Sequence, residues 1–224
     1  MLLLTVRKGF YGREKEIKKL EGLFGGDHGA ALIVGPPGMG KTELLRVITD
    51  IRKKKGDRIL FVTLDRETYS RHQSLMEVCN KLSPEHKEDL KKAIEQPKRS
   101  YVISLLPSKS KREPKEVLLQ VLSKELERLG GLIPRKLLVV IDNFQVADRE
   151  EREVWISIAR EELRNLFILL AERKEEIEGS LEDQPEYRYF ESDKRGVYIE
   201  LSPFPLKISG KYSRKREWMH PLRR

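Results

Sequence analysis

Cysteine is almost absent from this 224-residue chain, in which Cys79 is the single example. One thiol excludes an intramolecular disulfide and is typical of a reducing compartment, and we expect Cys79 to be a small buried apolar side chain. Long hydrophobic runs are missing too, since even 166–171 is too short to cross a bilayer. Residues 1–6 are also too short, and lack the basic leader, for a signal peptide. These absences predict a cytoplasmic protein that has no membrane contact.

Acidic residues are outnumbered, and the formal net charge is +9. The excess is local, because residues 206–224 hold seven Lys and Arg against one Glu, and the preceding chain is nearly balanced. Such a segment suits nucleic-acid phosphates or an acidic partner, although a solvated terminal arm explains it equally well. We therefore divide the chain into a core domain over 1–205 and a basic C-terminal tail over 206–224.

Three of the 15 glycines lie in one short segment that carries chemistry. Residues 35–42 read GPPGMGKT and match the phosphate-loop pattern GxxxxGK[ST] at every fixed position. The predicted nucleotide-binding residues are Gly35, Pro36, Pro37, Gly38, Met39, Gly40, Lys41 and Thr42. In such a loop the glycines let backbone N–H groups surround the β-phosphate, Lys41 reaches the β- and γ-phosphate oxygens, and the Thr42 hydroxyl ligates Mg²⁺. The structural alternative is a Gly/Pro turn that merely precedes a helix.

Five apolar runs have the length and character of buried strands, and helical patterns separate them. The runs are 30–34, 58–64, 137–142, 166–171 and 197–201. The first leads directly into the phosphate loop, and a helical pattern follows the loop, so the N-terminus of that helix points at the phosphates. Further helices are expected after Ser83-Pro84, after Glu113-Pro114 and around Trp155. Alternating strands and helices predict an α/β fold with parallel strands and right-handed crossovers.

The third run ends in an acid, Asp142, which is a second chemical signal. In phosphate-loop proteins an acid at this place holds the Mg²⁺ shell opposite the loop threonine. The pattern is weak alone, because many buried strands end in Asp. Together with the phosphate loop it predicts Thr42 and Asp142 as the metal-side pair.

Several motifs resemble those of the AAA+ and related signal-transduction (STAND-like) ATPases, in particular the archaeal-type ATPases. FYGREKEIKKL, which starts at Phe10, is similar to the N-terminal FxGRExEhxxL box of that family. The phosphate loop follows at the expected distance, and LLVVIDNFQ resembles the hhhhDEFQ strand. LFILLAER and YIELSPF resemble the fourth and fifth strands. The resemblance spans about residues 8 to 205.

The resemblance implies a three-layer P-loop NTPase whose parallel five-stranded sheet has the order 5-1-4-3-2 and carries helices on both faces. It implies ATP and Mg²⁺ as cofactors, and it places Phe10, Tyr11 and Arg13 beside the adenine. Without it, the two aromatics would be ordinary core or turn residues. It also makes Arg173, after the fourth strand, a sensor of the γ-phosphate. The alternative is a surface arginine paired with Glu172 or Glu176.

Two departures from the family pattern bear on activity. Asn143 stands where the family has the glutamate that polarises the attacking water, and an amide can orient a water but cannot take its proton. We therefore predict that Asn143, Lys41, Asp142 and Arg173 are the catalytic-site residues. With Asn143 in place of the glutamate we expect slow hydrolysis of ATP, unless Asp65 or Glu67 serves as the base. The second departure is that only about twenty residues follow the fifth strand. We therefore expect the helical lid of the family to be missing here, and a minimal domain, a fragment and a shortened gene product all explain this equally.

The sequence thus favours an ATP-binding, Mg²⁺-dependent nucleotide switch with weak ATPase activity. Its expected partners are ATP and ADP, a protein partner or a second copy of the chain, and nucleic acid through the basic tail. The first alternative is an active DNA-associated AAA+ ATPase of the origin-recognition or clamp-loader type. The second is an interaction module that keeps a relic phosphate loop.

Overall fold

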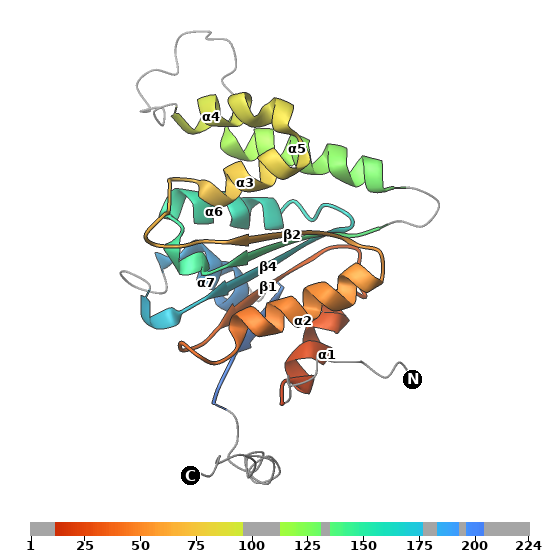
Figure 1. Ribbon diagram of the computed structural model, residues 1–224, viewed down its shortest axis with the longest axis vertical. Coiled ribbons are helices and arrows are strands. Elements are labelled where there is room, and N and C mark those ends of the chain that lie inside the picture. Colours follow the sequence, from red (N-terminus) through yellow and green to blue (C-terminus); the bar gives the residue numbers. More distant parts are fainter. Residues whose placement is uncertain (1–11, 96–112, 131–134, 177–182, 193–195, 204–224) are drawn as a thin grey trace, which may run out of the picture.

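A central parallel sheet organises the molecule (Figure 1), which is a computed structural model that describes residues 12–95, 113–130, 135–176, 183–192 and 196–203. Its strands are β1 (Gly29–Val34), β2 (Arg58–Thr63), β3 (Leu137–Asp142), β4 (Leu166–Glu172) and β5 (Val197–Glu200). They lie in the order β2-β3-β4-β1-β5, and every neighbouring pair is parallel. The predicted order 5-1-4-3-2 is therefore confirmed.

Helices cover both faces of this sheet (Figure 1). The helices α1 (Glu14–Leu23) and α2 (Lys41–Lys54) lie on one face. The opposite face carries α3 (Gln73–Leu82), α5 (Pro114–Leu129), α6 (Arg149–Ala159) and the short α7 (Pro185–Tyr187), with α4 (Lys87–Glu95) packed outside on α3 and α5. This is the three-layer α/β arrangement that the sequence predicts.

The apolar runs of the three inner strands, β1, β3 and β4, form strands because both of their faces are buried. Alternate residues of β1 show this, since Ala30, Leu32 and Val34 join one core cluster and Ala31 and Ile33 join the other. Every residue of β3 and β4 is buried. An uninterrupted apolar run, rather than an alternating one, is what a strand covered on both sides requires.

Local signals set the helix boundaries. Glu113 and Glu116 form a capping box at the start of α5, Pro114 occupies its first position, and Gly130 follows its last residue. Asp148 caps α6 by accepting a hydrogen bond from the Glu151 N–H. Ser83-Pro84 differs from expectation, because it opens a 3₁₀ turn (Pro84–His86) that leads directly into α4.

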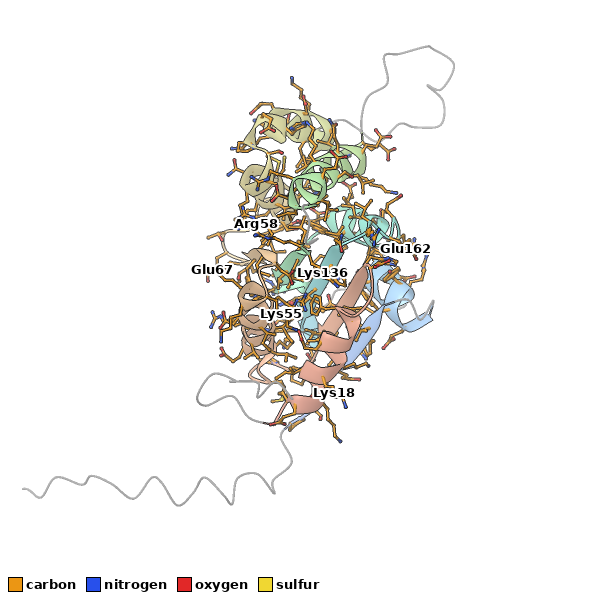
Figure 2. The ribbon with its side chains drawn as sticks, turned by 90° about the vertical axis from the view of Figure 1, so that its right-hand side faces the viewer. Lys18, Lys55, Arg58, Glu67, Lys136 and Glu162 are labelled. Atoms are coloured by element: carbon orange, nitrogen blue, oxygen red, sulfur yellow. The ribbon has the colours of Figure 1, made fainter. Side chains whose placement is uncertain are left out.

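At the end of the sheet where the strands begin, several charged side chains contact other parts of the protein. This end lies opposite the phosphate loop. Figure 2 faces this end and labels Lys55, Arg58 and Lys136 among others. Lys136 Nζ donates to two backbone carbonyl oxygens, including that of Gly26 at 2.9 Å, and lies over the Phe167 ring. These cations therefore serve the fold at the end remote from the phosphate loop.

Some sequence predictions fall outside the described residues, namely those for Phe10, Tyr11 and the tail at 206–224. Cys79 is described and is buried as expected, and burial raises the pKa of its thiol to about 11. Among the helices described, none has both the length and the apolar character needed to cross a membrane.

Candidate nucleotide site

The phosphate loop joins β1 to α2 at the carboxyl end of the sheet. Gly38 and Gly40 have φ values of 77° and 83°, in the left-handed region that side chains with a Cβ disfavour. Gly35 is required for another reason, because a Cβ there would lie 2.8 Å from the Leu201 carbonyl oxygen. The loop thus fits against the end of β5, and α2 begins immediately after Gly40. The first N–H groups of that helix have no partner within it and point into the loop.

Lys41 folds over the loop from the first position of α2. Its side-chain Nζ donates to the carbonyl oxygens of Gly35 and Pro36, the latter at 2.8 Å, and the residue is only 7% exposed. Burial lowers the pKa of Lys41, and the Arg173 guanidinium lowers it further. The carboxylates of Asp142 and Glu176 oppose this shift in the Lys41 pKa. Two cations and several carboxylates therefore surround the place where the loop would hold phosphates.

The predicted metal-side pair is in direct contact. Thr42 Oγ1 donates to Asp142 Oδ2 at 2.6 Å, although the two residues are 100 positions apart in the sequence. Asp142 is 2% exposed, and its other oxygen accepts the Asn143 N–H at 3.1 Å. A hydroxyl and a carboxylate are oxygen ligands of the kind that Mg²⁺ prefers, so this donor set fits a bound magnesium ion.

Asn143, which directly follows Asp142, makes contacts within the protein. Its φ of 58° is left-handed, a conformation that Asn tolerates better than most residues. Its side-chain Nδ2 donates to the Leu64 carbonyl oxygen at 3.0 Å and so ties β3 to the end of β2. The alternative bases, Asp65 and Glu67, are both exposed, and Asp65 accepts the Glu67 N–H at 3.0 Å.

Arg173 lies beside the phosphate loop. The register of β1 with β4 pairs Val34 with Glu172, so the next residues along the two chains, Gly35 and Arg173, leave the sheet at the same level. The Arg173 N–H donates to Gln145 Oε1 at 3.1 Å, and its Nη1 donates to Glu176 Oε1 at 2.6 Å. The arginine side chain therefore makes the pairing with Glu176 that the alternative predicts, and its role as a γ-phosphate sensor stays a prediction.

The side chain of Arg13 contacts the main chain of the phosphate loop. From the start of α1 its Nη2 donates to the Met39 carbonyl oxygen at 3.1 Å and to the Ser202 carbonyl oxygen at 2.8 Å. The residue is 3% exposed. It thus ties the loop to the segment after β5, and this contact is one that the sequence did not reveal.

A cluster of buried charged side chains lies at the end of β4, around its last residue, Glu172. Arg152 Nη1 contacts both Glu172, at 3.4 Å, and Glu186, and neither glutamate has any exposed surface. Burial raises the pKa of Glu172 to about 8, with the Glu186 carboxylate as the next cause. One guanidinium thus faces two buried carboxyl groups, and burial raises the pKa of both.

A second group of potential metal ligands lies where the segment after β2 meets α6. Oxygen and nitrogen atoms of His72, Asp148 and Glu151 lie within 4.8 Å of one another. Each has a protein partner, however: Glu151 accepts from the Ser74 N–H at 2.7 Å and the Tyr69 hydroxyl at 2.6 Å, and His72 contacts Asp148 at 3.2 Å. We interpret this cluster as an anchor between two segments of the fold.

Sequence reasoning missed Gln145 and gave Glu176 only as an alternative partner of Arg173. Gln145 accepts the Arg173 N–H and donates from Nε2 to Glu176 Oε2 at 3.3 Å. The available signal was the glutamine in the DNFQ segment, which matches the last letter of the hhhhDEFQ pattern.

The comparisons with known proteins agree with this geometry. Residues 9–169 match the AAA ATPase domain family, and the chain belongs to that family. It is therefore a P-loop protein of the AAA+ class. The search of curated proteins finds no match.

Among solved structures, Cdc6p from Pyrobaculum aerophilum matches with a TM-score of 0.55 and 17% identity, covering 88% of this chain and 47% of that one. The Aeropyrum pernix ORC1 protein, solved in complex with DNA, matches with a TM-score of 0.54 and 15% identity over 92% and 51%. A DNA replication initiation factor matches with a TM-score of 0.52 and 19% identity over 96% and 54%. At these identities the similarity shows the fold, and the chain spans about half the length of these structures.

Proposed function

We propose that this chain binds ATP with Mg²⁺ at the phosphate loop and hydrolyses it slowly, so that bound triphosphate acts as a switch. The observation that carries the proposal is the 2.6 Å contact between Thr42 and Asp142, which brings the loop and β3 together at one place. The two oxygens converge near the buried Lys41, which supports a site for a metal-bound triphosphate.

In this proposal different residues bind the phosphates, the metal and the adenine. Backbone N–H groups of the loop and the start of α2 hold the phosphates, and Lys41 exchanges its two carbonyl partners for phosphate oxygens. Thr42 and Asp142 hold the metal, which neutralises charge on the β- and γ-phosphates when bound. Phe10, Tyr11 and Arg13 remain our proposal for the adenine side, with Arg13 also fixing the loop through the Met39 carbonyl.

Slow hydrolysis follows from Asn143. Its side-chain amide has no basic lone pair, and its Nδ2 already donates to the Leu64 carbonyl oxygen. The end of β3 contacts the loop through Asp142, the end of β4 lies beside it, and Asn143 connects β3 to the segment after β2, so a bound triphosphate would bias these segments and, through them, a partner contact.

The decisive experiment is equilibrium binding of fluorescent ATP with and without Mg²⁺. We expect Lys41→Ala to weaken binding at least about tenfold, because the variant removes a buried cation from the phosphate site. Lys54→Ala is the matched control, since Lys54 is exposed at the far end of the same helix and should leave affinity unchanged. A wild-type chain that binds no ATP would favour the relic-loop alternative, and a folded Lys41→Ala variant of unchanged affinity would contradict the assignment of ATP binding to the phosphate loop.

A DNA-associated ATPase is the second candidate function. Its support is the fold shared with replication proteins, one of them solved in complex with DNA, together with the basic residues 206–224. Binding of duplex DNA that weakens steeply between about 50 and 200 mM salt would favour this candidate, because phosphate contacts release counterions.

A further inference from the structure

We propose that Gln145, Arg173 and Glu176 form a latch in which Glu176 competes with the γ-phosphate for Arg173, so that ATP opens the latch and ADP leaves it closed. The proposal rests on the proposed function, because it assigns ATP discrimination to the same site. It adds Glu176 as a competitor for the sensor arginine and Gln145 as its positioning residue.

Arg173 lies at the end of a strand next to the phosphate loop. β4 lies between β1, which leads into the phosphate loop, and β3, which ends in the metal-side acid Asp142. Arg173 is the first residue after β4 and leaves the sheet level with Gly35, the first residue of the loop. A guanidinium at this point can turn toward the γ-phosphate or away from it, and in this structure it turns to Glu176.

Glu176 collects contacts from the ends of three strands. Its Oε1 accepts Arg173 Nη1 at 2.6 Å, and its Oε2 accepts Gln145 Nε2 at 3.3 Å. From the segment after β2, Arg66 Nη2 lies 3.8 Å from the same Oε2. The carboxylate therefore joins the ends of β2, β3 and β4, which are the segments that a γ-phosphate would rearrange.

Gln145 holds Arg173 and Glu176 in place. Its Oε1 accepts the backbone N–H of Arg173 while its Nε2 holds Glu176, so one buried amide fixes both partners of the pair. The contact to the Arg173 backbone does not depend on the Arg173 side chain. The guanidinium can therefore leave Glu176 while the end of β4 stays in place.

Electrostatic attraction explains why Arg173 would leave Glu176 for the γ-phosphate. Arg173 and Lys41 are close enough for the Arg173 charge to lower the pKa of Lys41, and Glu176 offsets this repulsion. A triphosphate brings several negative charges to the same place and offers Arg173 a phosphate that it can bind through two N–H groups. Glu176 is 30% exposed and Arg173 36%, so the released carboxylate can return to water at small cost.

Equilibrium affinities for ATP and ADP, each with Mg²⁺, test the latch. We expect Glu176→Gln to tighten ATP binding about two- to fivefold, the range measured for partly exposed ion pairs, and to leave ADP affinity nearly unchanged. Arg173→Ala should weaken ATP more than ADP. In the double variant, Glu176→Gln should add nothing to Arg173→Ala, because the competitor has lost its target.

Glu175→Gln is the matched control. Glu175 is exposed on the same turn, and its charge also acts on Lys41, so the variant removes the same charge from the next position. Equal effects of the two Gln variants, or a Glu176→Gln effect that persists with Arg173→Ala, would overturn the latch while Lys41-dependent ATP binding remained. A wild-type chain that binds no ATP would overturn the proposed function and the latch together.

Discussion

Replacing Asn143 by Glu restores the base that the AAA+ pattern has at this position, and the structure shows what the change costs. Asn143 has a left-handed backbone with φ of 58°, and its side chain donates to the Leu64 carbonyl oxygen. Glu fits this backbone less well, at a cost of about 1 kcal/mol. It also loses the hydrogen bond, worth a further ~1 kcal/mol. The free energy of unfolding should therefore fall by roughly 2 kcal/mol, which lowers the Tm of a chain this size by roughly 4–8 °C.

The same substitution should raise ATP hydrolysis. A positioned general base is worth about two to four powers of ten in rate, and we expect the lower end, about a hundredfold. The reason is that a backbone held in the left-handed conformation limits where the Glu carboxylate can reach. ATP affinity should change little, because the phosphate contacts come from the loop, Lys41 and the metal rather than from Asn143.

Phosphate release at saturating ATP and Mg²⁺, together with thermal unfolding, measures both effects. Asn143→Gln is the control, since Gln has the length of Glu and the same backbone misfit but no basic carboxylate. An equal gain in rate from the Gln variant would refute the reasoning, and so would wild-type turnover of about one per second or faster. If Asn143→Glu changes nothing while Glu67→Gln abolishes a measurable activity, the base lies after β2.

Two other variants test the surroundings of the site. Gly35→Ala places a Cβ 2.8 Å from the Leu201 carbonyl oxygen, so the free energy of unfolding in urea should fall by about 1–3 kcal/mol. Gly22→Ala in α1 is the control, because a Cβ there meets no atom within 4 Å and should not lower the free energy of unfolding. The pKa of Glu172 rises on folding from 4.5 to about 8, so the folded chain binds the extra proton. The free energy of unfolding should therefore fall as pH rises through that window, by up to about 1.4 kcal/mol per pH unit. Glu172→Gln, which cannot ionise, should make this decline shallower in urea unfolding from pH 5 to 8, and an identical slope would contradict the assignment.

The sequence by itself determined the five strands and the phosphate loop. Apolar runs such as 137–142 form strands because both of their faces are covered, and a residue pattern shows that without knowledge of neighbours. Gly38 and Gly40 occupy left-handed positions, a local requirement that the GxxxxGK[ST] pattern records. The strand order came from the resemblance of motifs to a family, since periodicity alone does not say which strands are adjacent.

Only the tertiary structure decided the contacts around the loop. The bonds of Asn143 to Leu64, of Arg13 to Ser202 and of Arg173 to Gln145 join segments that are between 28 and 189 residues apart. Such contacts depend on the order and register of the parallel strands, which bring the carboxyl ends of β2, β3 and β4 to the same end of the sheet. A sequence motif names the residue types at that edge, but the partner that each side chain takes is fixed by its distance from atoms contributed by other strands.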